Sequence, residues 1–252
     1  MRSLRLHHPR RPKPKRVHGE RNVAVNVKPH HRFQEIYWAT LEDGTRKLAT
    51  KNLAAGTSVY GERLVNFKHE EYRLWDPYRS KFAAAILKGL DAVPIRPDQR
   101  VLYLGAASGT TASHVSDIVG EGGHVYCVEF ASRSLRELVN NVCVFRYNMS
   151  PILADARLPE TYSRMVGRVD SIYCDVAQPE QARVLADNAD MFLAEGGWVM
   201  LAIKAQSIDV TKEPSVVYRN EIAVLEARGF QISAVVGLEP YDKAHTMVVA
   251  QK

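Results

Sequence analysis

The sequence contains little cysteine and no long apolar run. Its three cysteines, Cys127, Cys143 and Cys174, are an odd number, widely spaced and set in apolar contexts. This pattern argues against a disulfide framework and a zinc site, and it is typical of reduced core residues in an intracellular protein. No run of 18 apolar residues is present, so we expect no transmembrane helix, and the basic N-terminus lacks the apolar segment of a secretory signal. We therefore expect a cytoplasmic protein without a membrane anchor or a bound metal.

Net charge is absent from most of the chain. The formal charge of the 252 residues is +6, and residues 1–20 alone hold seven Lys or Arg against one acid, while residues 21–252 balance. Residues 1–20 also carry three prolines and almost no large apolar side chains, so this basic tail cannot bury enough surface to offset its ordering entropy and should be disordered when free. The tail either adds salt-sensitive affinity for a nucleic acid or serves only as a solubilising extension.

Short β-type runs follow the tail. Asn22–Lys28 alternates apolar and polar residues, and Phe33–Thr40 is aromatic and β-branched. Glu42–Thr45 is a turn signal after which Lys47–Asn52 returns as a paired strand. We therefore predict a small β-rich domain over residues 21–72, followed by a second domain over residues 73–252.

The second domain alternates helical and β patterns after an amphipathic helix at Ser80–Leu90. Such alternation predicts an α/β fold with a mostly parallel sheet and helices on both faces. Only the short link 239–245 joins the last two strands, which permits a hairpin but no parallel crossover, so one terminal strand should be antiparallel. The predicted strands are Val101–Leu104, His124–Phe130, Pro151–Leu153, Val169–Asp175, Trp198–Ile203, Gln231–Leu238 and Thr246–Ala250; the predicted helices lie near 111–119, 133–145, 179–194 and 214–228.

A turn rich in small residues follows the first of these strands. Leu104–Thr111 reads LGAASGTT, and its glycines let a ligand approach the backbone closely. The spacing lacks the third glycine of a dinucleotide site and the lysine of a phosphate loop. S-adenosylmethionine has no phosphate to bind and does not need either feature. The pattern favours a site of that type over a bare tight turn.

Carboxylates follow the next three strands. Glu129, Asp155 and Asp175 each stand at the carboxyl end of a predicted strand, where open α/β sheets bind ligands. An acid at the position of Glu129 can bind both ribose hydroxyls of an adenosine. Asp155 could accept a hydrogen bond from the adenine amino group.

Five sequence motifs in this order resemble the fibrillarin family, in particular its archaeal members. They are Leu74–Lys81 (LWDPYRSK), Tyr103–Thr111 (YLGAASGTT), Val128–Phe130 (VEF), Asp175–Pro179 (DVAQP) and Ile203–Ala205 (IKA). The resemblance covers roughly residues 22–252 and implies a Rossmann-like, S-adenosylmethionine-dependent methyltransferase fold. It places the cofactor on Gly105, Ala106, Ala107, Ser108, Gly109, Thr110, Thr111, Glu129, Phe130, Asp155, Ala156, Asp175 and Gln178.

The resemblance also implies a function. Fibrillarins methylate ribose 2′-hydroxyls of RNA as the catalytic subunit of a box C/D ribonucleoprotein. A guide RNA selects the nucleotide in rRNA or tRNA, a Nop-family scaffold protein places the enzyme, and a kink-turn-binding ribosomal-type protein completes the particle.

The family's catalytic set maps onto Lys81, Asp175, Lys204 and His245. Lysines in apolar elements need a carboxylate partner, and Asp175 is the natural one. A ribose hydroxyl is a poor nucleophile until it is deprotonated or oriented. We expect Lys204 to activate it, Lys81 and Asp175 to hold the geometry, and His245 to assist positioning or proton relay. The residue that takes the proton stays open.

Two positions depart from the family pattern: Gln206 replaces an expected Arg, and Ala244 replaces an Asp before His245. These departures keep one alternative open, a non-catalytic RNA-binding assembly subunit with a vestigial cofactor pocket. A methyltransferase for a non-RNA substrate is the other alternative. The presence of all four catalytic candidates argues against the first alternative. The lysine and aspartate set suits a hydroxyl nucleophile, which argues against the second.

Overall fold

The computed structural model describes residues 26–252, so the predicted basic tail lies outside the described residues. The described chain begins with a five-stranded antiparallel sheet of order β1-β2-β3-β5-β4. The predicted turn at Glu42–Thr45 joins β2 to β3 as expected, with Ile36 opposite Thr50. The strands are β1 (Asn26–Pro29), β2 (Ile36–Thr40), β3 (Arg46–Lys51), β4 (Leu64–Phe67) and β5 (Glu70–Leu74).

The hairpin of β4 and β5 was not predicted from the sequence. Its turn residues, Lys68 and His69, both have positive φ, at 47° and 69°, without the glycine or asparagine that usually marks such a turn. β5 pairs with β3 and carries Leu74 into the module core beside Val65. The strand therefore runs two residues past residue 72, and the domain division stays a prediction.

The second sheet has seven strands in the order β11-β12-β10-β9-β6-β7-β8. Strands β10, β9, β6, β7 and β8 are parallel to one another, and β12 is antiparallel to both β10 and β11. The mostly parallel sheet and the antiparallel last strand are confirmed, with β12 seated between β10 and β11. The strands are β6 (Arg100–Leu104), β7 (His124–Glu129), β8 (Met149–Leu153), β9 (Val169–Cys174), β10 (Leu193–Lys204), β11 (Gln231–Gly237) and β12 (His245–Gln251).

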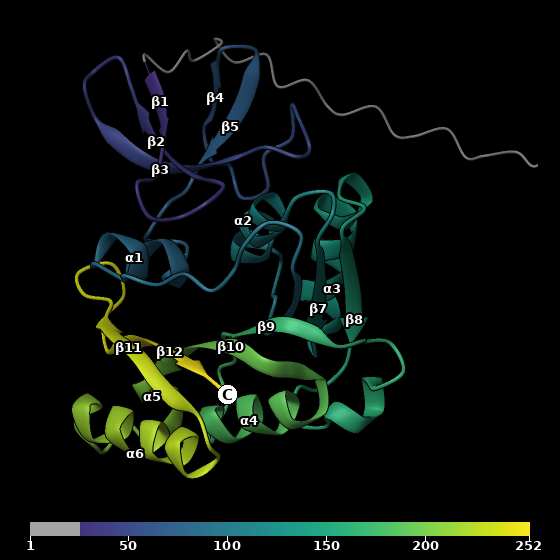
Figure 1. Cartoon of the computed structure of the whole chain (residues 1–252), viewed down its shortest axis with the longest axis vertical. Helices are drawn as coiled ribbons and strands as arrows, with labels where there is room; N and C mark the ends of the chain where they lie inside the picture. The colour runs from purple at the N-terminus through teal and green to yellow at the C-terminus, as the bar shows by residue number, and fades with distance from the viewer. Residues whose placement is uncertain (1–25) are drawn as a thin grey trace, which may run out of the picture.

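Helices cover both faces of this sheet, as the alternating pattern predicts (Figure 1). One core cluster packs α1, α2 and α3 against the sheet, and the other packs α4 and α6 against the opposite face. Two short 3-10 turns, Cys143–Phe145 and Pro159–Tyr162, flank β8. The helices are α1 (Lys81–Leu87), α2 (Thr110–Val119), α3 (Ser132–Asn141), α4 (Gln181–Phe192), α5 (Ala205–Ile208) and α6 (Pro214–Ala227).

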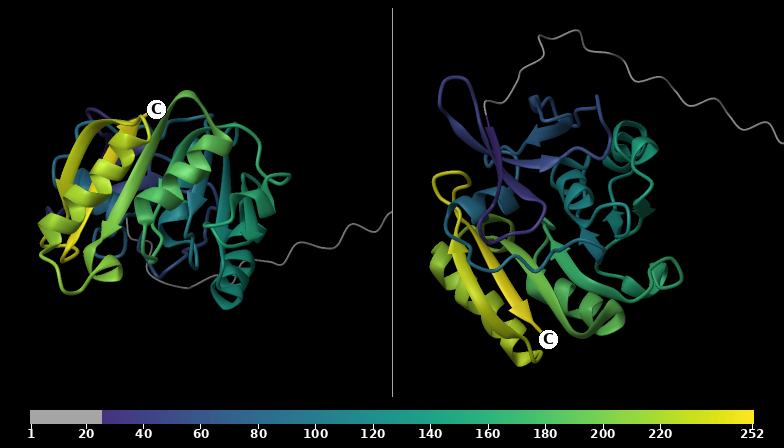
Figure 2. Two further views of the ribbon diagram at one scale, coloured as in Figure 1. Left: turned by 90° about the horizontal axis from the view of Figure 1, so that it is seen from below. Right: turned by 45° about the horizontal axis from the view of Figure 1, so that its top comes forward.

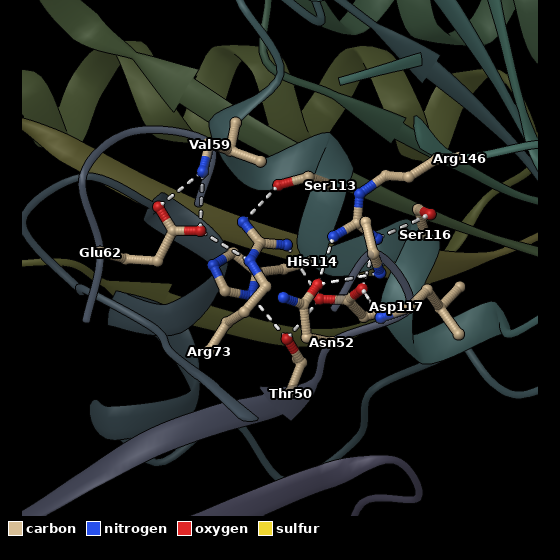
Figure 3. A network of polar contacts seen from close by, with 12 residues as sticks. Thr50, Asn52, Val59, Glu62, Arg73, Ser113, His114, Ser116, Asp117 and Arg146 are labelled. Carbon is tan, nitrogen blue, oxygen red and sulfur yellow. Dashed lines mark hydrogen bonds and ion pairs between the residues drawn. The ribbon is translucent and has the colours of Figure 1, made fainter. Parts of the chain in front are cut away.

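The five-stranded module lies over α1 and α2, on the face of the large sheet away from α4 and α6 (Figure 2). Fully buried charges join the two parts (Figure 3). Arg73 of β5 donates to Glu62 at 2.6 Å and to Asp117 of α2 at 2.9 Å, and Arg146 pairs with the other oxygen of Asp117. Because every one of these charges has a partner, the network fixes the module on α2 without leaving an isolated buried ion.

No helix within residues 26–252 is both long and apolar enough to cross a bilayer. All three cysteines are free thiols, and two of them, Cys127 and Cys174, are fully buried.

Candidate active site

The turn after β6 forms the floor of the site. Gly105 has φ of 79°, and a Cβ on it would lie 2.9 Å from the backbone oxygen of Asp175. Gly109 has φ of 97°, and a Cβ there would lie 2.6 Å from Leu138 of α3. A side chain at Gly105 would have to displace the backbone at the end of β9, and one at Gly109 would have to displace the side chains of Leu138 and Val142. The glycines are required by close approach as well as by backbone conformation.

A cavity of about 220 Å³ opens beside this turn, at the carboxyl ends of the parallel strands. Seven of the residues predicted to hold a cofactor line it, together with Lys204. They are Gly105, Ala107, Glu129, Phe130, Ala156, Asp175 and Gln178. The strand-end position is where open α/β sheets bind ligands.

The remaining predicted cofactor residues lie around the cavity instead of in its wall. Ala106 is buried in the core, and Thr110 begins α2. Thr111 donates to Ser80 at 2.9 Å, which links the start of α2 to the start of α1. Ser108 and Gly109 complete the turn. These residues shape the turn, and a direct contact from them to a cofactor stays a prediction.

Glu129 is held with its carboxylate toward the cavity. One oxygen accepts a hydrogen bond from the backbone N–H of Ala107 at 2.8 Å, and the other accepts from Ala131 at 2.8 Å. Each carboxylate oxygen has a further lone pair. The fixed pair of acceptors fits two neighbouring hydroxyls of a ribose.

Asp155, the predicted adenine contact, stands apart from the cavity wall, whereas Gln178 belongs to it. Asp155 pairs with Arg157 at 2.6 Å, and hydrogen bonds from Arg157 and Gln178 lower the pKa of the Asp155 carboxyl. Asp155 is not among the residues that line the cavity. Gln178 Oε1 is buried without a hydrogen-bond partner and belongs to the cavity wall. An amino group from a ligand would satisfy this amide oxygen, so the residues present fit an adenosine.

Three of the four predicted catalytic residues meet beside this cavity. Lys204, the last residue of β10, places Nζ 2.9 Å from Oδ1 of Asp175 and donates to the Asp175 backbone oxygen at 2.7 Å. Lys81, the first residue of α1, reaches the same Oδ1 at 3.3 Å. All three side chains are largely buried, at 14 to 19% exposed. One carboxylate therefore holds two ammonium groups at the edge of the cavity.

The fourth residue, His245, begins β12 directly opposite Lys204. Its Nδ1 lies 2.9 Å from Asp242 Oδ1 and 2.6 Å from the backbone oxygen of Lys243. Asp242 also places Oδ2 3.5 Å from Lys81 Nζ. Sequence reasoning missed Asp242, although its spacing of three from His245 was a signal within the β11–β12 link.

Comparison with known proteins identifies the relationship. The Fibrillarin family profile matches residues 27–252. The chain belongs to the fibrillarin family. A fibrillarin-like rRNA/tRNA 2′-O-methyltransferase of Staphylothermus marinus is 58% identical over 227 residues, which are 90% of this chain and 97% of the relative.

Solved fibrillarins share the fold. The crystal structure of Aeropyrum pernix fibrillarin, with natively bound S-adenosyl-L-methionine, is 53% identical, covers 90% of this chain and 98% of its own, and superposes with a TM-score of 0.85. Fibrillarin in a complex with Nop5p is 42% identical, covers 86% and 97%, and gives a TM-score of 0.76.

The two departures from the fibrillarin pattern lie next to the predicted catalytic residues. Gln206 is exposed in α5, two residues after Lys204. Ala244 has φ of 55°, in the left-handed region that an alanine rarely adopts, and its oxygen accepts from the Ala205 N–H. Both departures leave the four catalytic candidates in place. Among residues 26–252, no group of three His, Cys, Asp or Glu side chains could hold a metal ion.

Proposed function

We propose that this fibrillarin is an S-adenosylmethionine-dependent methyltransferase that acts on ribose 2′-hydroxyls of rRNA and tRNA. One observation carries the proposal: Asp175 and Lys204 both line the cavity and are in contact with each other, and Lys81 joins them. The arrangement places a cluster of positive donors where a methyl donor and a hydroxyl would meet. The activities named for the relatives support the same assignment.

The cofactor site consists of the glycine turn, the Glu129 carboxylate and the Gln178 amide. Glu129 would accept hydrogen bonds from the two ribose hydroxyls, and Gln178 Oε1 would accept one from the adenine amino group. When bound, S-adenosylmethionine supplies an electrophilic methyl group on a positively charged sulfur.

The catalytic residues orient the hydroxyl. Lys204 donates one ammonium N–H to the Asp175 backbone oxygen, and another N–H can donate to the attacking oxygen. Asp175 fixes the direction of both lysines because one of its oxygens receives both. Orientation of this kind lowers the entropic part of the barrier.

The partners follow from the same family. We propose that a Nop-type scaffold protein, a box C/D guide RNA and a kink-turn-binding ribosomal-type protein assemble with this chain in an archaeal-like cytoplasm. A solved relative was crystallised with Nop5p, which supports the scaffold as a direct partner.

The decisive experiment measures transfer of tritiated methyl from S-adenosylmethionine to a guide-matched RNA, with scaffold, kink-turn protein and guide present. We expect incorporation at one ribose 2′-oxygen and none when that nucleotide is 2′-deoxy. Methylation of a base, or equal labelling of the deoxy substrate, would exclude the proposal.

Two variants separate an enzyme from an assembly subunit with a vestigial pocket. Lys204→Ala and Asp175→Ala should lose most activity while they retain cofactor binding in calorimetry. Glu129→Ala should instead weaken cofactor binding. Near-normal rates in both of the first variants would reject the catalytic assignment, and unchanged affinity in the third would reject the ribose contact.

A further inference from the structure

A second carboxylate, Asp242, contacts two of the proposed catalytic residues, Lys81 and His245. It lies in the link between β11 and β12, and one oxygen contacts Lys81 at 3.5 Å while the other contacts His245 at 2.9 Å. Lys81 therefore lies between two carboxylates, Asp175 and Asp242. His245 is connected to the lysine and aspartate cluster through Asp242.

The contacts of His245 determine which of its nitrogens carries the proton. Nδ1 faces two acceptors, the Asp242 carboxylate at 2.9 Å and the backbone oxygen of Lys243 at 2.6 Å. Neither acceptor has a proton to give, so Nδ1 must be the donor. In the neutral ring Nε2 is then the unprotonated nitrogen, which accepts.

We propose that Asp242 is a positioning residue that holds His245 in the Nδ1–H tautomer, so that Nε2 is the acceptor for the proton of the substrate hydroxyl. The proposal deepens the proposed function and rests on it. Asp242 acts on the reaction through His245 and Lys81 and does not itself touch the substrate.

The lysines are poorly placed for this task. Lys204 donates to the backbone oxygen of Asp175 and lies 2.9 Å from its carboxylate, and Lys81 contacts both Asp175 and Asp242. An ammonium group donates hydrogen bonds and does not accept them. His245, opposite Lys204 on the neighbouring strand, is the group in the set with an available acceptor nitrogen.

The proton transfer balances with methyl transfer. As the hydroxyl oxygen bonds to the methyl carbon, its O–H bond breaks, the proton moves to Nε2, and the electron pair of the carbon–sulfur bond returns to sulfur. The positive charge of the sulfonium thus ends on the imidazolium, where the negative charge of Asp242 stabilises it.

Other charges surround His245, and a pH measurement reports on them together. Tyr218 of α6 belongs to this set because burial raises its pKa and the charges of Glu239 and Asp242 raise it further. The titratable and charged groups on the elements around the imidazole are Glu239, Tyr241, Asp242 and Lys243 of the link, Lys81 of α1, Asp175 after β9, Lys204 of β10 and Tyr218 of α6.

The first test is independent of activity. The ¹⁵N chemical shifts of the His245 imidazole, assigned by comparison with His245→Gln, distinguish the two tautomers in the isolated protein. We expect Nδ1–H in the native protein and a mixture of tautomers in Asp242→Ala, where the Lys243 backbone oxygen is the remaining acceptor for Nδ1–H. A native ring protonated on Nε2 when neutral, or an unchanged Nδ1–H tautomer in Asp242→Ala, would overturn the proposal.

The second test uses single-turnover methyl transfer in the assembled particle. Because protonated Nε2 cannot accept, the rate should rise with pH as the imidazolium loses its proton. Asp242→Asn should lower the plateau of the methyl-transfer rate at high pH by about tenfold or more. The rising part of the rate–pH profile should also move to lower pH, because the substitution removes a negative charge that favours imidazolium. Asp242→Glu should restore part of the rate, and Asp91→Asn, the same change at an exposed position in the loop after α1, should change neither.

A purely structural role for Asp242 predicts a lower plateau rate with the rising part of the pH profile unmoved, and that result would reject the proposal. If the native particle transfers no methyl to RNA, the proposed function fails. The ¹⁵N shifts still decide separately whether Asp242 sets the tautomer.

Discussion

Arg73 of β5 and Asp117 of α2 form an ion pair at 2.9 Å with both side chains fully buried. The pair connects the five-stranded module to the helix that follows the glycine turn. Asp117 also pairs with Arg146 and accepts a hydrogen bond from Thr50 of β3 at 2.7 Å (Figure 3). One carboxylate thus neutralises two guanidinium groups between the two parts of the fold.

Asp117→Ala should therefore destabilise the protein strongly. It leaves Arg146 without its carboxylate partner and Arg73 with Glu62 alone, and breaking a buried pair in this way costs about 3–5 kcal/mol. Urea denaturation followed by circular dichroism measures the loss. Asp190→Asn removes a carboxylate from a more exposed pair with Arg228 and should cost less than about 1 kcal/mol. Equal losses in the two variants would show that the buried network adds nothing.

Stability should fall on the acid side of neutrality because of His114. Burial, with Arg73 and Arg146 nearby, lowers its pKa well below 6.5, so the folded protein keeps this ring neutral while the unfolded chain takes up a proton. Stability from this group is fully present above pH 6.5 and declines as the pH falls below that value.

Thermal unfolding between pH 5 and 7.5 tests this effect. His114→Gln should be less stable at neutral pH but should lose less stability on acidification than the native protein. His69→Asn, at the exposed turn of the β4–β5 hairpin, should retain the native slope. An unchanged slope in His114→Gln would contradict the assignment.

Gly105→Ala should damage the cofactor site. The added Cβ would lie 2.9 Å from the Asp175 backbone oxygen, so the turn and the end of β9 must separate. We expect S-adenosylmethionine affinity to drop by about tenfold or more in calorimetry, which corresponds to about 1.4 kcal/mol. Gly167→Ala, at a glycine with open space around it, is the matched control and should bind normally.

Ala244→Gly should stabilise the protein slightly. Ala244 is held at φ of 55°, where an L side chain costs about 1–2 kcal/mol of stability. Glycine removes that cost, but its greater freedom in the unfolded chain lowers stability by about 0.4–1 kcal/mol. The net gain of about 0.5–1 kcal/mol should raise the melting temperature. Ala55→Gly, at an exposed position outside the left-handed region, should lower it. A lower melting temperature in Ala244→Gly would mean that the strain is absent.

Much of the fold was predictable because local pattern and topology agree. Every strand of the large sheet carries an apolar run, and the short 239–245 link permits only a hairpin, so β12 could be predicted antiparallel. The hairpin of β4 and β5 was missed because Lys68 and His69 adopt a turn conformation without turn residues. The polar run Glu70–Glu71 also hides a strand whose remaining residues, Tyr72 to Leu74, are buried.

The site was predictable where it depends on strand ends and less so elsewhere. Glu129 and Lys204 could be placed because parallel strands bring their carboxyl ends to one edge. Asp242 could not, because its position depends on how the β11–β12 link folds back over α1. Arg73, Asp117 and Arg146 look like ordinary surface charges in the sequence, and only the packing of the module on α2 buries them.

The position of β12 has a consequence for synthesis. This strand follows all its neighbours in the chain, yet it lies between β10 and β11. The residues of β12 must leave the ribosome before β11 can join the sheet through it. A nascent chain without β12 therefore cannot complete the sheet. His245 opens this strand and arrives opposite Lys204 only at that final step. The sheet and the set of four proposed catalytic residues are therefore completed together, and a nascent chain that stops before β12 would lack both.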